Sequence, residues 1–267
     1  GKARSRPDLV RQVLRKARQE GILPTIKAAF NRLDQPMALG YSSAGTIVEA
    51  GTGLQGFKTG DRVACAGGGF ASHAEYVVAP QNLLVHLPGN VDEESAAFTT
   101  LGAIALQGLR LAEPQIGENV AVIGLGLLGL LSVQRAKAAG CRVFGVDIDP
   151  ARVALEKQFG VGAAVRSAAL EAGMGFSPTG FDRVLICADT KSNDPVELAG
   201  ELARDRARVV AVGAVGMSIP RRPYYDKELQ FIVSRSYGPG RYDPAYEEGG
   251  QDYPIGCEAL LKQSLER

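Results

Sequence analysis

The chain has 267 residues, of which 45% are hydrophobic and 22% charged, a composition typical of a globular protein with a substantial core. At roughly 150 residues per domain, this length favours about two domains. Lysine and arginine number 30 against 29 acidic residues, and the net charge of +1 argues against a nucleic-acid partner. The sequence contains no secretory signal and no run of about 18 apolar residues, so we expect a cytoplasmic protein that does not bind a membrane.

The cysteines are far apart and form no C-x-x-C pair, which argues against a structural zinc cluster and against a redox motif. Cys141 and Cys187 lie in or beside apolar runs, where a thiol is usually a small buried hydrophobe.

The start of the chain favours two amphipathic helices. Ser5 and Asp8 have the spacing of a capping box, and the apolar residues that follow recur at helical spacing as far as Gly21. A second helix is expected from Pro24.

Short strand patterns with glycine-rich turns come next. The expected strands are residues 40–49, 61–66 and 71–79. His73 stands in the last of these, where we expect it to be exposed or hydrogen-bonded rather than catalytic. Such strands predict a small barrel, and we place this first domain at residues 1–90.

From residue 92 onward, buried strands alternate with helices. The expected strands are residues 119–123, 142–147, 163–166, 181–188 and 207–213. One helix is expected to begin at residue 92, and three more are expected at residues 127–139, 151–159 and 196–202. This alternation predicts a Rossmann domain with a doubly wound parallel sheet at residues 91–235. Residues 236–267 are then a C-terminal tail.

A glycine motif lies at the first strand-to-helix junction of that series. Gly124, Gly126 and Gly129 form G-x-G-x-x-G between an apolar strand and a helix. Gly124 permits the tight turn, Gly126 leaves room for a pyrophosphate, and Gly129 lets the helix lie close to the strand. Asp147 ends the next strand 23 residues after Gly124, where about 20 is expected. The alternative is a glycine-rich turn without a ligand.

This motif predicts NAD as the cofactor. The N–H groups at the helix start, together with the positive end of the helix dipole, hold phosphates. Asp147 accepts hydrogen bonds from the adenosine ribose and repels a 2′-phosphate, although Arg152 is near enough to weaken that preference. The ends of two later strands complete the site. The predicted cofactor-binding residues are Gly124, Leu125, Gly126, Leu127, Leu128, Gly129, Asp147, Ile148, Arg152, Ala188, Asp189, Val212, Gly213 and Ala214.

Between residues 40 and 216, about two thirds of the chain, the sequence resembles the medium-chain dehydrogenase/reductase family, which includes zinc alcohol dehydrogenases and quinone reductases. The segments that carry the resemblance are, in order, GYSSAGTIVEAG, GFKTGDRVA, ASHAEYVVAP, AAFTTLGAIALQGL, VIGLGLLG and VDIDP. The implied fold class is α/β, a Rossmann doubly wound parallel sheet plus a GroES-like β-barrel domain. That barrel is expected to be partial, because the family's first barrel strands and its C-terminal return have no match here.

The flanks KARSRPDLVRQVL and SRSYGPGRYDP resemble a bi-domain oxidoreductase subgroup, in which the dehydrogenase unit is joined to a second oxidoreductase domain. A fused or partner oxidoreductase domain is therefore one expected partner, and a homodimer is the other. The tyrosines and arginines of residues 234–246 suit a sugar or an anionic group, and they suit a surface loop or a partner interface equally well.

The chain departs from the zinc members of this family at the metal ligands. Those members carry Gly-His-Glu where this chain has Gly40, Tyr41 and Ser42, and the cysteine implied near residues 99–101 is missing. A tyrosine does not replace a neutral imidazole on zinc, so we expect no metal. Tyr41 is then the candidate proton donor with Ser42 assisting, and Thr100 is a candidate substrate contact. The alternative is that Tyr41 only fills the vacated metal pocket.

Together these features predict a zinc-independent NAD(H)-dependent oxidoreductase. It would transfer hydride to or from a carbonyl or hydroxyl group of a small-molecule substrate, such as a sugar derivative. Two alternatives stay open. One is a quinone-reductase-like or enoyl-reductase-like enzyme that uses NADPH, and the other is a non-catalytic NAD-binding module of a larger assembly.

Overall fold

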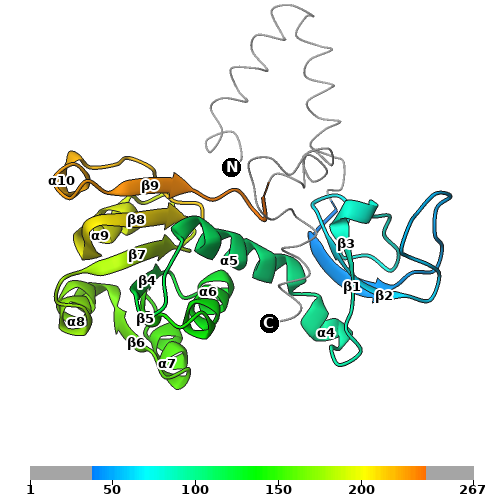
Figure 1. The fold of residues 1–267 in the computed structure, drawn as a ribbon, viewed down its shortest axis with the longest axis horizontal. Helices are drawn as coiled ribbons and strands as arrows, with labels where there is room; N and C mark the ends of the chain where they lie inside the picture. The colour runs from blue at the N-terminus through cyan, green and yellow to red at the C-terminus, as the bar shows by residue number, and fades with distance from the viewer. Residues whose placement is uncertain (1–37, 239–267) are drawn as a thin grey trace, which may run out of the picture. The chain divides into compact units, whose positions relative to one another are not determined.

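The computed structural model of the protein describes residues 38–238 (Figure 1). The two helices expected near the start of the chain lie outside the described residues, as does nearly all of the expected tail, including Arg241 and Tyr242. The described helices and strands all belong to the unit that begins at Gly40. Within residues 38–238, no helix has the length and apolar character needed to cross a membrane.

The first layer is a three-stranded antiparallel sheet. Its strands are β1 (Ser42–Thr46), β2 (Arg62–Ala66) and β3 (Leu84–His86), in the order β1-β2-β3. The short helix η1 (Gln81–Leu83) leads into β3. On one face of the sheet, Ala64, Ala66 and Val85 pack with Leu106 and Ala103 of the following helix. The other face carries a smaller buried cluster, made of Val63, Cys65, Leu84 and Ala71.

The expected strand at residues 71–79 is wrong, because this segment forms bends and irregular coil. Both edges of β2 are already paired, to β1 and to β3, so the segment finds no partner there. Tyr76 and Val78 are 75% and 89% exposed, so the alternating pattern does not bury one face. The expectation that His73 is exposed is confirmed. The sequence pattern does not predict β3, because a strand of three residues is too short to show an alternating pattern.

The second sheet has six strands, all parallel, in the order β6-β5-β4-β7-β8-β9 (Figure 1). They are β4 (Asn119–Ile123), β5 (Arg142–Asp147), β6 (Gly162–Val165), β7 (Phe181–Ile186), β8 (Ala203–Ala211) and β9 (Gln230–Val233). The chain winds outward from β4 to β6, then returns and winds outward from β7 to β9. This order confirms the doubly wound sheet, with its switch point between β4 and β7.

Helices connect and cover these strands. They are α4 (Glu93–Ala96), α5 (Thr99–Ala112), α6 (Leu127–Ala138), α7 (Pro150–Gln158), η2 (Arg166–Ala168), α8 (Ala169–Phe176), α9 (Asp194–Leu202) and α10 (Arg221–Tyr224). Side-chain caps start two of them, because the Asp92 carboxylate accepts from the Ser95 N–H at 2.7 Å and Asp149 accepts from the Ala151 N–H at 2.8 Å. The sequence reading missed α8, which contains two glycines, and β9, which has only four residues.

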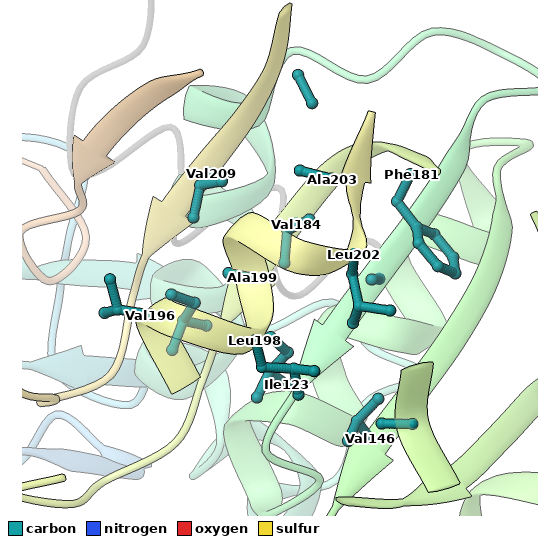
Figure 2. Close-up of a cluster of buried hydrophobic side chains, with 14 of the residues drawn as sticks. Ile123, Val146, Phe181, Val184, Val196, Leu198, Ala199, Leu202, Ala203 and Val209 are labelled. Carbon is teal, nitrogen blue, oxygen red and sulfur yellow. The ribbon is translucent and has the colours of Figure 1, made fainter. Parts of the chain in front are cut away.

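Both faces of the six-stranded sheet are buried. Alternate strand residues such as Ile123 and Val184 face α9, where they meet Val196, Leu198 and Leu202 (Figure 2). The other face carries a second cluster under α5 and α6. Its largest members are Leu109, Val120, Val122, Leu125, Val133, Val143, Val153, Leu185 and Val210. Burial on both sides explains why these strands are continuous apolar runs.

Candidate cofactor and substrate site

The turn between β4 and α6 requires glycine at two positions. Gly124 has φ +95°, and a Cβ added there would lie 2.6 Å from the Ala188 nitrogen. A Cβ at Gly129 would lie 1.9 Å from the Gly124 oxygen, so the first turn of α6 packs directly on this junction. The geometry therefore agrees with the tight turn and the close approach expected from the motif.

Gly126 presents open space. It is the N-cap of α6, and a Cβ added there would meet only the Arg152 guanidinium, at 3.9 Å. Because glycine supplies no side-chain acceptor to the N–H groups of the first turn, this end of α6 suits an anionic ligand. The residues around Gly126 thus fit the pyrophosphate of a dinucleotide.

Asp147, at the end of β5, is buried and fixed by the turn beside it. Its carboxylate accepts hydrogen bonds from the Leu125 N–H at 2.6 Å and from the Asp149 N–H at 2.8 Å. The guanidinium of Arg152 lies 3.6 Å from Asp147 and 3.7 Å from Asp149. The carboxylate therefore orients the glycine turn as well as the start of α7, a role that the sequence reading missed along with Asp149. Ile148, next in the chain, is exposed.

Three neighbouring strand ends meet beside the glycine turn. Ala188, after β7, lies against both Gly124 and Gly213, since a Cβ at Gly213 would be 2.1 Å from the Ala188 oxygen. The Thr190 N–H donates to the Ala214 carbonyl at 2.8 Å. The structure thus brings Ala188, Asp189 and Val212 to Ala214 to one edge with the glycine motif, as the sequence predicts.

An asparagine that the sequence reading did not single out holds these loops together. The Asn193 side chain donates to the Ser218 carbonyl at 2.7 Å and accepts from the Ser218 N–H at 2.9 Å. The amide thereby pairs with the main chain as a neighbouring strand would. The only sequence signal was an asparagine just before the start of α9.

The helix α5 connects the glycine-turn edge to the small sheet. A Cβ at Gly108 would lie 2.6 Å from the Val212 side chain, so this part of α5 packs at the carboxyl end of β8. Thr100, eight residues earlier, donates its N–H to the Ser42 hydroxyl at 3.3 Å. At 1.5 Å per residue, roughly 12 Å separates the two positions along the helix. Ser42 and Tyr41 are therefore placed beyond the carboxyl edge of the parallel sheet.

The three candidate catalytic residues have different surroundings. Tyr41 is 44% exposed, and its carbonyl accepts from the Gly67 N–H at 3.0 Å. The Ser42 hydroxyl donates to the Ala97 carbonyl at 2.5 Å, and the buried Thr100 hydroxyl donates to the Cys65 carbonyl at 3.4 Å. In this structure both hydroxyl groups donate to main-chain carbonyls. Their catalytic assignment stays a prediction.

The described residues do not fit a metal ion. Within residues 38–238, the His, Cys, Asp and Glu side chains form no group of three suited to one. Burial raises the pKa of the Cys65 thiol and raises that of Cys187 to about 11, which disfavours the thiolates that bind zinc. His86 stacks on Phe57 at 4.4 Å and contacts the Gly56 carbonyl at 2.7 Å.

Two family profiles match the chain. The profile described as "Alcohol dehydrogenase GroES-like domain" matches residues 15–89, and the one described as "Zinc-binding dehydrogenase" matches residues 128–248. Sorbitol dehydrogenase of Halalkalibacterium halodurans is 30% identical over an alignment of 247 positions, which covers 79% of this chain and 71% of that protein. The chain belongs to the medium-chain dehydrogenase/reductase family.

Solved structures of the medium-chain dehydrogenase/reductase fold agree with this assignment. Galactitol-1-phosphate dehydrogenase of Escherichia coli superposes with a TM-score of 0.69 at 25% identity, over 87% of this chain and 74% of that one. A structure from Sinorhizobium meliloti 1021, described as a zinc-binding dehydrogenase bound to NADP, has a TM-score of 0.70 at 23% identity, over 86% of this chain and 73% of that one. At that identity, the second likeness bears on the fold alone. The GroES-like and Rossmann parts expected from the resemblance are thereby confirmed.

Proposed function

We propose that this dehydrogenase uses NAD(H) to interconvert a secondary hydroxyl group and a ketone in a sugar alcohol or a related polyol, without zinc. The observation that carries the proposal is the glycine turn joined to Asp147 by the 2.6 Å hydrogen bond from Leu125. The polyol class is supported by the relatives, since sorbitol dehydrogenase and galactitol-1-phosphate dehydrogenase are both named for such substrates.

The cofactor supplies hydride transfer when it is bound. We assign its pyrophosphate to the open space at Gly126 and to the N–H groups of Leu127 and Leu128. Asp147, Ile148 and Arg152 would lie around the adenosine. Ala188, Asp189 and the segment Val212, Gly213 and Ala214 would lie on the nicotinamide side.

The preference for NAD over NADP rests on charge. A 2′-phosphate would approach the carboxylates of Asp147 and Asp149, both already close to the single guanidinium of Arg152. Because these two negative charges outnumber that positive charge, the site favours the free ribose hydroxyl of NAD.

For the substrate end, we assign Tyr41 as a hydrogen-bond donor to the substrate oxygen. Ser42 and Thr100 tie the segment that carries it to α5. Zinc independence rests on the donor set, because the first motif offers Tyr41 and Ser42 in place of the family's histidine and glutamate.

The same proposal includes the domain boundaries, the cellular location and the partner. The domains would divide near residues 90 and 235, the protein would be cytoplasmic, and the partner would be a second copy of the chain or a joined oxidoreductase domain. The substrate itself is a small molecule.

Calorimetric titration with NADH and NADPH, with metal analysis of the same sample, tests the cofactor and the zinc independence. We expect tight NADH binding, weaker NADPH binding and no stoichiometric zinc. A panel of polyols with NAD, followed at 340 nm, then tests the reaction. Preference for NADPH would favour the reductase alternative, and NADH binding without turnover would favour a non-catalytic module. Stoichiometric zinc would contradict the assignment of Tyr41.

A further inference from the structure

His73 occupies the space beside Gly40. A Cβ added at Gly40 would lie 2.2 Å from the His73 Cδ2 atom and 2.5 Å from Nε2. Gly40 also has φ +89°, a conformation that other residues rarely adopt. The imidazole therefore lies directly on the main chain one residue before Tyr41, a placement that only glycine at position 40 allows.

The turn that carries His73 is fixed to the Tyr41 segment. The Gly67 N–H donates to the Tyr41 carbonyl at 3.0 Å, and the Ala71 N–H donates to the Gly67 carbonyl at 2.9 Å. Ala71 and Ser72 are buried, whereas His73 is exposed. A buried, hydrogen-bonded turn thus presents an accessible imidazole beside the residues proposed to meet the substrate.

Two hydroxyl groups near His73 are already engaged. The hydroxyl protons of Ser42 and Thr100 go to main-chain carbonyls. Within residues 38–238, by contrast, the ring nitrogens of His73 have no hydrogen-bond partner. Imidazole is also the side chain that most often transfers protons in enzymes.

We propose that His73 exchanges the proton with the substrate oxygen during hydride transfer, an inference that rests on the proposed function. In oxidation, the carbinol C–H bond would break, and its hydrogen and bonding electron pair would pass together as hydride to the oxidised nicotinamide cofactor named above. The hydroxyl proton goes to a ring nitrogen of His73 as the C=O bond forms. The exposed ring then passes that proton to water, and reduction follows the same path in reverse.

The chain contains only two histidines, so proton NMR of the imidazole rings reports on each of them separately. We expect NADH together with a polyol to shift the His73 signals and to leave those of His86 unchanged, because His86 is bound to Gly56 and Phe57 in the small sheet. If calorimetry detects NADH binding and the His73 signals do not move, the inference is overturned while the proposed function stands. Absence of NADH binding would remove both.

Chemical rescue separates proton transfer from a structural role. We expect H73A to lower kcat by roughly a hundredfold, the usual size of an acid–base contribution, with the Kd for NADH within about twofold of the wild type. Free imidazole should restore part of the lost rate, because the vacated space beside Gly40 admits it. H86A is the matched control and should show no rescue. An H73A enzyme with wild-type kcat, or one that imidazole leaves unchanged, would contradict the role of His73.

Discussion

The main-chain carbonyl of Gly124 packs directly against Gly129. A methyl group at position 129 would fall 1.9 Å from the Gly124 oxygen, and α6 would have to lift away from the glycine turn. We expect G129A to lower the free energy of unfolding by about 1–3 kcal/mol or more, the usual cost of overpacking. Chemical denaturation measures this change.

The matched control for G129A is G175A, an exposed helical position in α8 with nothing within 4 Å of an added Cβ. Here alanine should raise stability by about 0.5–1 kcal/mol, because glycine loses more conformational freedom in a helix. Equal effects at both positions would contradict the close packing at Gly129.

Asp147 illustrates how one side chain serves both structure and specificity. The substitution D147N keeps the shape of the side chain but removes the negative charge of the carboxylate, which accepts hydrogen bonds from the Leu125 and Asp149 N–H groups. A charge-assisted hydrogen bond contributes about 1.5–3 kcal/mol, so weakening the bond proposed between this carboxylate and the adenosine ribose should raise the Kd for NADH about 10- to 100-fold. The preference for NADH over NADPH should narrow as well. D149N, which removes the neighbouring charge, should have a smaller effect on the NADH titration.

At the scale of an element, α7 carries a buried acid against β5. Glu156 is fully buried and approaches Gly145, where a Cβ would lie 3.2 Å from its Cγ and 2.9 Å from the Leu125 side chain. Neither carboxyl oxygen has a hydrogen-bond partner among the described residues. Burial raises the pKa of Glu156 from 4.5 to about 7. The folded protein therefore keeps a proton that the unfolded chain loses at lower pH.

This raised pKa predicts how stability varies with pH. The stability associated with neutral Glu156 is fully present below about pH 4.5 and is lost as pH rises to about 7, a change of about 3 kcal/mol. E156Q mimics the neutral acid and should remove this part of the slope in denaturation measured across that range. The exposed E171Q control should keep the wild-type slope. An unchanged slope in E156Q would show that the Glu156 carboxyl is hydrated or paired.

At the scale of the whole unit, α5 joins the antiparallel sheet to the parallel one. Ser42 makes two of the connecting hydrogen bonds, to Ala97 and from Thr100. We expect S42A to lower stability by about 1–3 kcal/mol, since the buried Thr100 N–H and Ala97 carbonyl lose their partner. Thermal unfolding measures the change.

S218A is the control for the loss of a serine hydroxyl. Ser218 bonds Asn193 only through main-chain atoms, so its replacement should leave the melting temperature unchanged. If S42A melted like the wild type, the Ser42 bridge would carry little of the attachment of α5. In that case the apolar contacts of Ala103 and Leu106 would hold the small sheet instead.

The sequence alone determined the parallel sheet and the glycine turn. The expected bounds of β4 and β5 match the structure, and α6 and α7 differ by about one residue, because the signals are local: apolar runs, caps and glycine spacing. The same local signals marked Gly124, Gly126, Gly129 and Asp147 as neighbours, since parallel strands end at one edge.

Only the tertiary structure decided which partner each side chain meets. Residues 230–233 form the strand β9 because they pair with the free edge of β8. Residues 71–79 form no strand beside β2, because both edges of β2 are already paired. The contacts of His73 with Gly40 and of Glu156 with Gly145 join residues that are distant in sequence. No periodicity or spacing encodes such pairs, because they depend on how separate elements pack together.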